Sequence, residues 1–90
     1  MEIEFDPNKD QANRLKHGVW LALAAEMDLG AAIIEPDQRR RYGEERLVAL
    51  GPISGQLYLL AFTMRGEVMR VISLRKANAR ERRRYAQKTS

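Results

Sequence analysis

The chain has 90 residues, with 16 Lys and Arg against 12 Asp and Glu, so its formal net charge is +4. This length fits one small domain, which we place over residues 1–90, and it favours a shallow groove over a deep catalytic cavity. Cysteine is absent and there is one His, which excludes disulfide bridges and argues against a zinc site. We therefore expect chemistry that needs neither a metal nor another cofactor.

The positive charge is concentrated at the C-terminal end. Residues 70–90 carry eight basic side chains and one acidic one, a net of +7, whereas residues 1–69 have a net of −3. This concentration indicates a polyanionic or acidic partner, with nucleic acid favoured over a merely soluble basic tail. No signal peptide and no apolar run of roughly 20 residues is apparent. We expect a cytoplasmic protein without membrane contact.

The first predicted elements are a short strand and a helix. Residues 2–5 alternate polar and apolar side chains, as a half-buried strand does. Asp6 can cap a helix that begins at Pro7 and runs to about His17, where Gly18 can end it.

Helical spacing separates two faces of this helix. We expect a thin buried stripe, made of Asn8, Ala12 and Leu15. Lys9, Asn13 and Lys16 share another face, with His17 beside Asn13.

A second helix is predicted over residues 20–29. It is apolar nearly all round, so we expect it to be buried against a sheet, with Trp20 in the core. A short strand over residues 31–34 follows.

Three further strands are predicted over residues 45–50, 57–64 and 68–75. The connections 51–55 and 65–66 are short, which predicts an antiparallel meander with 57–64 in the centre. A last helix follows, with Asn78 and Glu81 as a capping-box pair and with Ala79, Tyr85 and Ala86 as its apolar residues. The order of these elements predicts an α+β fold: a mainly antiparallel sheet with two N-terminal helices and one C-terminal helix.

The last strand ends in a cluster of basic residues. Strict alternation places Ile72 and Leu74 on the core face, and Val71, Ser73 and Arg75 on the other face. A guanidinium group at this position can hold a phosphate with two hydrogen bonds.

Four motifs, in order and in register, resemble the BrnT family over residues 4–86. The opening motif is Phe5-Asp6-Pro7, followed by Asn13 and Lys16-His17-Gly18-Val19. The middle motifs are Gly43-Glu44-Glu45-Arg46 and Phe62-Thr63-Met64-Arg65-Gly66. The closing motif is Arg70-Val-Ile-Ser-Leu-Arg75-Lys76-Ala, followed by Glu81-Arg82 and Tyr85. Two departures are the apolar run Trp20–Leu23, where the family has a hydroxyl cap and acidic residues, and Phe62 in place of Tyr.

The resemblance implies a RelE-like ribonuclease toxin of a type II toxin–antitoxin system that cuts RNA and inhibits translation. It also implies a hetero-oligomer with a BrnA-like ribbon-helix-helix antitoxin, which alone contacts DNA.

RNA carries its own nucleophile, the 2′-hydroxyl, so a site without a metal needs an acid, a base and cations. Our candidate catalytic residues are His17, Lys16, Arg65 and Arg75. His17 is a candidate general acid or base, although a His in a last helical turn can serve only the helix dipole. Our candidate RNA-binding residues are Lys9, Asn13, Lys76, Arg82 and Tyr85. Tyr42 is a further residue that could stack on a base.

This hypothesis requires His17, Arg65 and Arg75 to share one exposed surface. The alternative is a module that binds RNA on the same basic face without cutting it. In another alternative the basic C-terminal helix serves purely as a dock for an acidic antitoxin.

Overall fold

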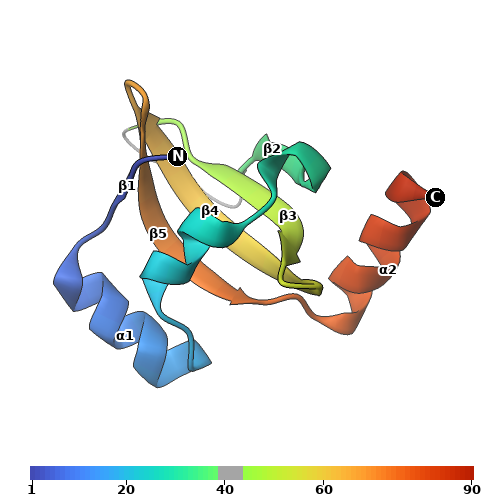
Figure 1. Cartoon of the computed structure of the whole chain (residues 1–90), viewed down its shortest axis with the longest axis horizontal. Helices are drawn as coiled ribbons and strands as arrows, with labels where there is room; N and C mark the ends of the chain where they lie inside the picture. Colours follow the sequence, from blue (N-terminus) through green and yellow to red (C-terminus); the bar gives the residue numbers. More distant parts are fainter. Residues whose placement is uncertain (39–43) are drawn as a thin grey trace.

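The computed structural model describes residues 1–38 and 44–90, and these residues form a five-stranded sheet (Figure 1). The strands are β1 (Ile3–Glu4), β2 (Ile33–Pro36), β3 (Leu47–Ile53), β4 (Gln56–Arg65) and β5 (Val68–Lys76). They lie in the order β1–β5–β4–β3–β2, and every neighbouring pair is antiparallel except β1 with β5. The predicted meander, with residues 57–64 in its central strand, is confirmed.

Two tight turns connect the strands of the meander. Ser54 and Gly55 join β3 to β4 with φ angles of 49° and 81°, and Gly66, with a φ of 63°, opens the turn from β4 to β5. Two successive positive φ angles are typical of a two-residue hairpin turn. The expected five-residue connection over 51–55 is therefore wrong, because residues 51–53 pair with residues 56–58 and extend β3.

A bulge in β5 changes which side chains reach the core. Ser73 pairs with Ala61 while Val71 pairs with Phe62, so Ile72 is one extra residue in the ladder. Strict alternation is interrupted there, and Val71 and Leu74 are both buried on the core face. The expected placement of Val71 and Ile72 is thus wrong, whereas Ser73 and Arg75 do share the other face.

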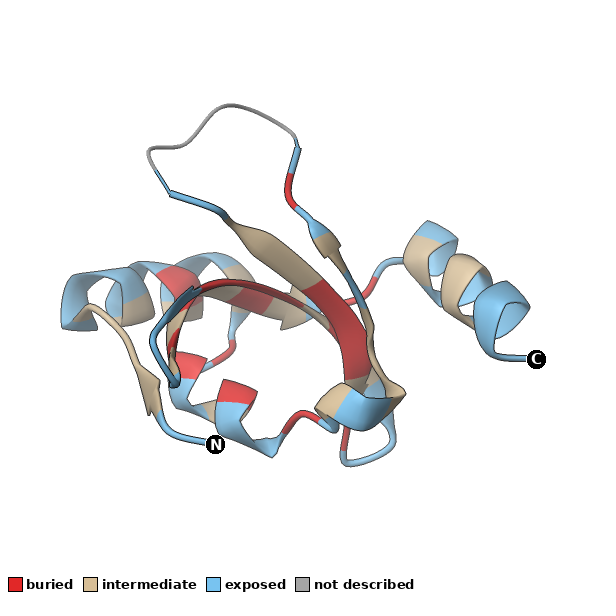
Figure 2. Cartoon of the chain, turned by 90° about the horizontal axis from the view of Figure 1, so that it is seen from above, coloured by how far each residue is buried: buried red, intermediate tan, exposed pale blue. Residues whose placement is uncertain are grey.

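The core face of the sheet is covered by the segment between α1 and β2 (Figure 2). Two 3₁₀ helices, η1 (Leu21–Glu26) and η2 (Leu29–Ala31), stand where we expected one α-helix over 20–29. A 3₁₀ helix has three residues per turn, which explains why Leu21, Ala24 and Met27 are the buried positions. Trp20 is 59% exposed, so its expected place in the core is wrong.

Trp20 instead packs against α1 (Pro7–His17). The guanidinium carbon of Arg14 lies 3.9 Å from the centre of the Trp20 ring, as in a cation–π contact. A carboxylate oxygen of Asp10 accepts a 2.8 Å hydrogen bond from the backbone N–H of Leu21 at the start of η1. These contacts join α1 to η1.

Helix α1 has the predicted bounds and caps, including the Asp6 side chain at its start and Gly18, with a φ of 70°, at its end. The expected buried stripe is wrong, because Asn8 and Ala12 are exposed and Leu15 is 83% exposed. The buried residue is Asn13, whose side chain is bonded to backbone atoms of the sheet. Polar contacts, and not apolar burial, therefore determine which face of α1 lies against the sheet.

Helix α2 (Ala79–Thr89) projects from the end of the molecule opposite α1 (Figures 1 and 2). Its predicted capping box is confirmed: Asn78 accepts from the Glu81 N–H, and Glu81 accepts from the Asn78 N–H. None of its residues is buried, and Ala79 and Ala86 are exposed. Polar side chains hold it instead, including the Tyr85 hydroxyl, which donates to the Ala31 carbonyl at 2.6 Å, and an ion pair of Arg84 with Glu35.

The fold is thus α+β, as predicted, with one α-helix on each side of the strand-rich part of the sequence. In the described part of the chain, no helix combines the length and the apolar character that a membrane crossing requires.

Gly51 provides a test of how closely the residues on either side of η2 pack against β3. A methyl group at this position would lie 2.7 Å from the Cβ of Ala32 and 3.1 Å from the sulfur of Met27. We expect Gly51→Ala to lower the free energy of unfolding by about 2 kcal/mol, measured by urea denaturation. Gly30→Ala is the matched control, because the nearest atom to its Cβ is a flexible carboxylate oxygen at 3.4 Å. Equal stability of the two variants would contradict this packing.

Candidate active site

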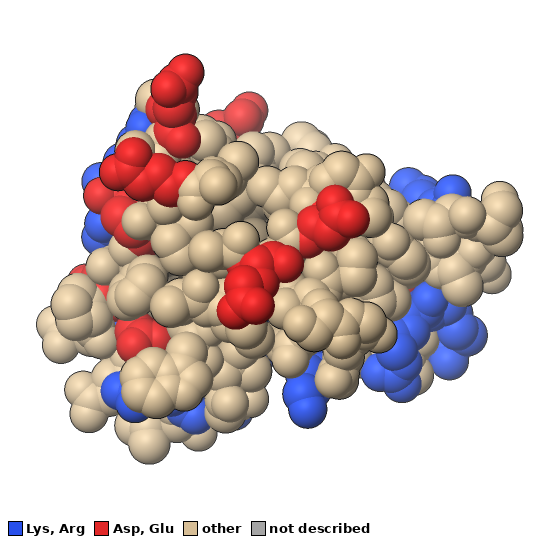
Figure 3. All heavy atoms as spheres, in the orientation of Figure 1, with Lys and Arg blue, Asp and Glu red and all other residues tan. Residues whose placement is uncertain are grey.

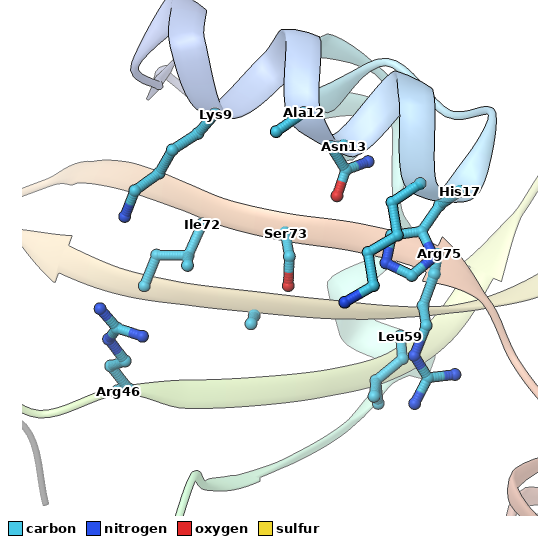
Figure 4. A pocket seen from close by; sticks show the side chains of 11 residues that line it. Lys9, Ala12, Asn13, His17, Arg46, Leu59, Ile72, Ser73 and Arg75 are labelled. Atoms are coloured by element: carbon cyan, nitrogen blue, oxygen red, sulfur yellow. The ribbon is translucent and has the colours of Figure 1, made fainter.

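A groove of about 490 Å³ opens between α1 and the sheet face that lies opposite the core (Figure 4). One wall comes from α1, through the side chains of Lys9, Ala12, Asn13, Lys16 and His17. The floor comes from β4 and β5, through Leu59, Ala61, Ile72, Ser73 and Arg75, and Arg46 lies just before β3. The groove is therefore built on secondary-structure elements, with α1 as one wall and the sheet as its floor.

Basic side chains surround this groove. Lys9 and Arg46 lie at one end in Figure 4, and His17 and Arg75 lie side by side at the other. None of the described residues that line it is acidic. By contrast, Figure 3 shows acidic side chains spread over the face that carries η1, with most of the visible Lys and Arg at its margins and on α2. A polyanion is thus attracted to the groove and not to the η1 face.

The environment of His17 favours its neutral form. Desolvation by burial lowers the pKa of His17 below its ordinary value of 6.5, and the positive charges of Lys16 and Arg75 lower it further. At neutral pH the imidazole is therefore mainly uncharged, with a nitrogen lone pair able to accept a proton.

Arg75 is held in place by a carboxylate from α2. Its Nη1 and Nη2 atoms each donate a 2.8 Å hydrogen bond to a separate oxygen of Glu81. The Glu81 side chain is 17% exposed and the Arg75 side chain 30% exposed, so the pair is partly shielded from water. This contact fixes the direction of the guanidinium group.

Asn13 has a structural role in place of the RNA contact that we expected. Its amide nitrogen donates to the carbonyls of Val19 and Leu74, each at 2.8 Å, and its oxygen accepts from the Leu74 N–H at 3.1 Å. Both amide hydrogens are used, so none is left for a phosphate.

The structure brings together part of the predicted site. His17, Lys16, Arg75, Lys9 and Asn13 all line the groove. Arg65 does not, because it ends β4 at the hairpin with β5, six residues along β4 from Leu59, which pairs with Arg75, and thus roughly 20 Å away. Its guanidinium group lies 3.4 Å from Glu44. The expected grouping of Arg65 with His17 and Arg75 is therefore wrong.

The other predicted RNA-binding residues also lie outside the groove. Lys76 follows Arg75 on β5 and points to the opposite face, where it lines a second groove with Trp20 and Tyr58. Arg82 donates to the Ala77 carbonyl at 2.8 Å, and Tyr85 is bonded to Ala31. Tyr42 lies outside the described residues.

Two polar side chains that line the groove, Ser73 and Arg46, were absent from our sequence-based site. Ser73 could have been found, because it shares a strand face with Arg75 at a spacing of two. Arg46 stood in a recognised motif, but only the pairing of β3 with β4 brings it next to the groove. Across residues 1–38 and 44–90, no group of three or more His, Cys, Asp or Glu is arranged to hold a metal ion.

The lowered pKa of His17 predicts how the stability of the folded protein changes with pH. Because the unfolded chain binds a proton near pH 6.5 and the folded chain only at lower pH, protonation favours unfolding. The contribution of the neutral His17 to the free energy of unfolding is fully present above pH 6.5. It is lost as the pH falls from 6.5 through the lower pKa of the folded protein. We expect wild type to lose more stability than His17→Gln between pH 7.5 and 5.5 in urea denaturation. Parallel curves for the two proteins would contradict this environment for His17.

Comparison with known proteins identifies a family for this chain. The family model described as "Ribonuclease toxin, BrnT, of type II toxin-antitoxin system" matches residues 5–81, and these include every described residue that lines the groove. No curated protein matches the chain. Since the family model covers most of the sequence, the chain belongs to the BrnT family of ribonuclease toxins of type II toxin–antitoxin systems.

Proposed function

We propose that this protein is a metal-independent endoribonuclease that cuts RNA in the groove beside α1. One observation carries the proposal: the imidazole of His17 lies beside Lys16 and Arg75 in a groove that also presents Lys9 and Arg46 and whose described lining has no carboxylate. An anionic chain fits this charge, and membership of a ribonuclease toxin family supports RNA as that chain.

The proposed reaction uses the RNA 2′-hydroxyl as its nucleophile. His17, neutral at pH 7, takes the 2′-hydroxyl proton as the 2′-oxygen forms a bond to the neighbouring phosphorus. The bond from phosphorus to the 5′-oxygen breaks, and we assign Lys16 as the donor of the proton to this leaving oxygen. Arg75 stabilises the extra negative charge of the phosphorane, while Arg46 and Lys9, at the other end of the groove, bind another phosphate of the RNA chain. The products are a 2′,3′-cyclic phosphate and a 5′-hydroxyl.

This assignment makes His17 the base and not the acid. The positive charges beside it oppose its protonation in the free enzyme, which is the property that a base needs at neutral pH. The value of kcat/KM should therefore rise with increasing pH, as His17 loses its proton at a pKa below 6.5.

Cleavage of RNA in EDTA tests the proposal directly. We expect wild type to leave cyclic phosphate ends, and His17→Ala to lower kcat/KM about 1,000-fold through loss of the base. Arg75→Ala should lower it about 100-fold through loss of charge stabilisation. Product ends and rates are measured on a short labelled RNA.

Arg65→Ala is the matched control, because Arg65 lies at the distant hairpin and is expected to leave the rate within about twofold. A requirement for added magnesium would overturn the metal-independent chemistry. Salt-sensitive binding of intact RNA, with no product, would favour the non-catalytic binding module.

We infer further that the cleavage inhibits translation and that a BrnA-like ribbon-helix-helix antitoxin neutralises it in a hetero-oligomer. The type II family supports an antitoxin partner, and the basic groove and α2 suit an acidic segment of that partner. A RelE-like relationship of the fold is part of the same proposal.

Expression in cells tests this inference. The wild-type chain alone should stop protein synthesis, whereas His17→Ala should not. Co-expression with a ribbon-helix-helix protein from the adjacent reading frame should restore synthesis and allow the two proteins to be purified together. Normal synthesis with wild type alone would contradict a translation-inhibiting toxin.

A further inference from the structure

The contact between Arg75 and Glu81 joins the groove to helix α2, which polar contacts hold to the rest of the protein. Glu81 accepts from both terminal nitrogens of Arg75, and one of its oxygens also accepts from the Asn78 N–H at 2.9 Å. Helix α2 buries none of its residues. The carboxylate of Glu81 in the C-terminal helix is thus bonded directly to Arg75, a cation that lines the groove.

We propose that Glu81 is a positioning residue for RNA cleavage, which aims the guanidinium of Arg75 into the groove and offsets its charge beside His17. This inference rests on the proposed ribonuclease function. It adds to that function a residue that does not line the groove itself.

The hydrogen bonds of Arg75 show how it can hold a phosphate while bound to Glu81. A guanidinium group has five N–H donors in a plane. Two of them bond Glu81, and Nη1 also donates to the Lys76 carbonyl at 3.2 Å. Among the described residues, none accepts from Nε–H or from the second hydrogen on Nη2. These two donors lie on one edge of the plane, in the geometry that a phosphate oxygen pair accepts.

The charge of Glu81 also acts on His17. The groove presents Lys16 from α1 and Arg75 from β5 to the imidazole, with Arg46 and Lys9 farther along. Glu81 brings a carboxylate to Arg75 from α2, next to the imidazole. It reduces the net positive charge that His17 experiences, so that its removal should make protonation of His17 less favourable.

Replacement of Glu81 by Gln tests both parts of the proposal. Glu81→Gln keeps an acceptor for the Asn78 N–H but loses the charge and the paired hydrogen bonds to Arg75. We expect kcat to fall about tenfold with a smaller change in KM, because the transition state loses an oriented cation. The NMR titration of His17, the sole His of the chain, should move to lower pH.

Three further variants separate positioning from folding. Asn78→Ala weakens the helix cap but keeps the Glu81 side chain on Arg75, so it should lower thermal stability and leave the His17 titration unchanged. Glu44→Gln removes the carboxylate of the remote Arg65 pair and should change neither readout. Glu81→Asp keeps the charge on a shorter side chain, so the titration should stay near wild type while kcat falls.

The outcomes decide between the two roles. An unchanged His17 titration and rate in Glu81→Gln would overturn the proposal, as would an Asn78→Ala variant that reproduces both effects. If Glu81→Gln does not fold, Glu81→Asp decides through its rate: a lowered kcat supports positioning, and a wild-type kcat overturns it. The titration needs no RNA, so absence of cleavage in wild type would contradict the ribonuclease function and leave the electrostatic part testable.

Discussion

The side-chain amide of Asn13 is the contact on which the rest of the site depends. Helix α1 has almost no apolar surface turned inward, so burial of hydrophobic side chains does not hold it against the sheet. Two hydrogen bonds between the buried Asn13 amide and the backbone of Leu74 in β5 do so, and a third ties Val19, just after the helix, to the same side chain. They set the distance between α1 and β5, and that distance is the width of the groove. The same bonds turn Lys9, Lys16 and His17 toward the floor.

A groove built in this way collects like charges, which repel one another. The repulsion is kept tolerable because the groove is open to water and because Arg75 is paired with a carboxylate from outside the lining. His17 responds by releasing its proton more readily. A bound phosphate chain would relieve the same repulsion, so the free protein is arranged to favour an anionic ligand.

The bulge at Ile72 links the core to this site. It allows Val71 and Leu74 to be buried on one face of β5 while Ile72, Ser73 and Arg75 face the groove. One strand therefore serves the hydrophobic core and the site together. Bulges are common next to active sites, where they redirect side chains without ending the strand.

The sequence by itself determined the features that depend on neighbouring residues. The bounds and caps of α1, the capping box of α2 and the meander all follow from contacts within a few residues, and the motifs indicated the family. It also indicated His17, Lys16 and Arg75 as parts of one site.

Only the tertiary structure decided which cations meet. The bonds of Asn13 to Leu74 span 61 residues, and no local pattern predicts that a polar residue selects the inner face of α1. Strand register places Arg65 outside the groove and Arg46 in it, at the end away from Arg75, and the bulge moves Ile72 out of the core. These outcomes depend on pairing between distant segments, whose free energy is decided by the whole fold and not by the residues on either side.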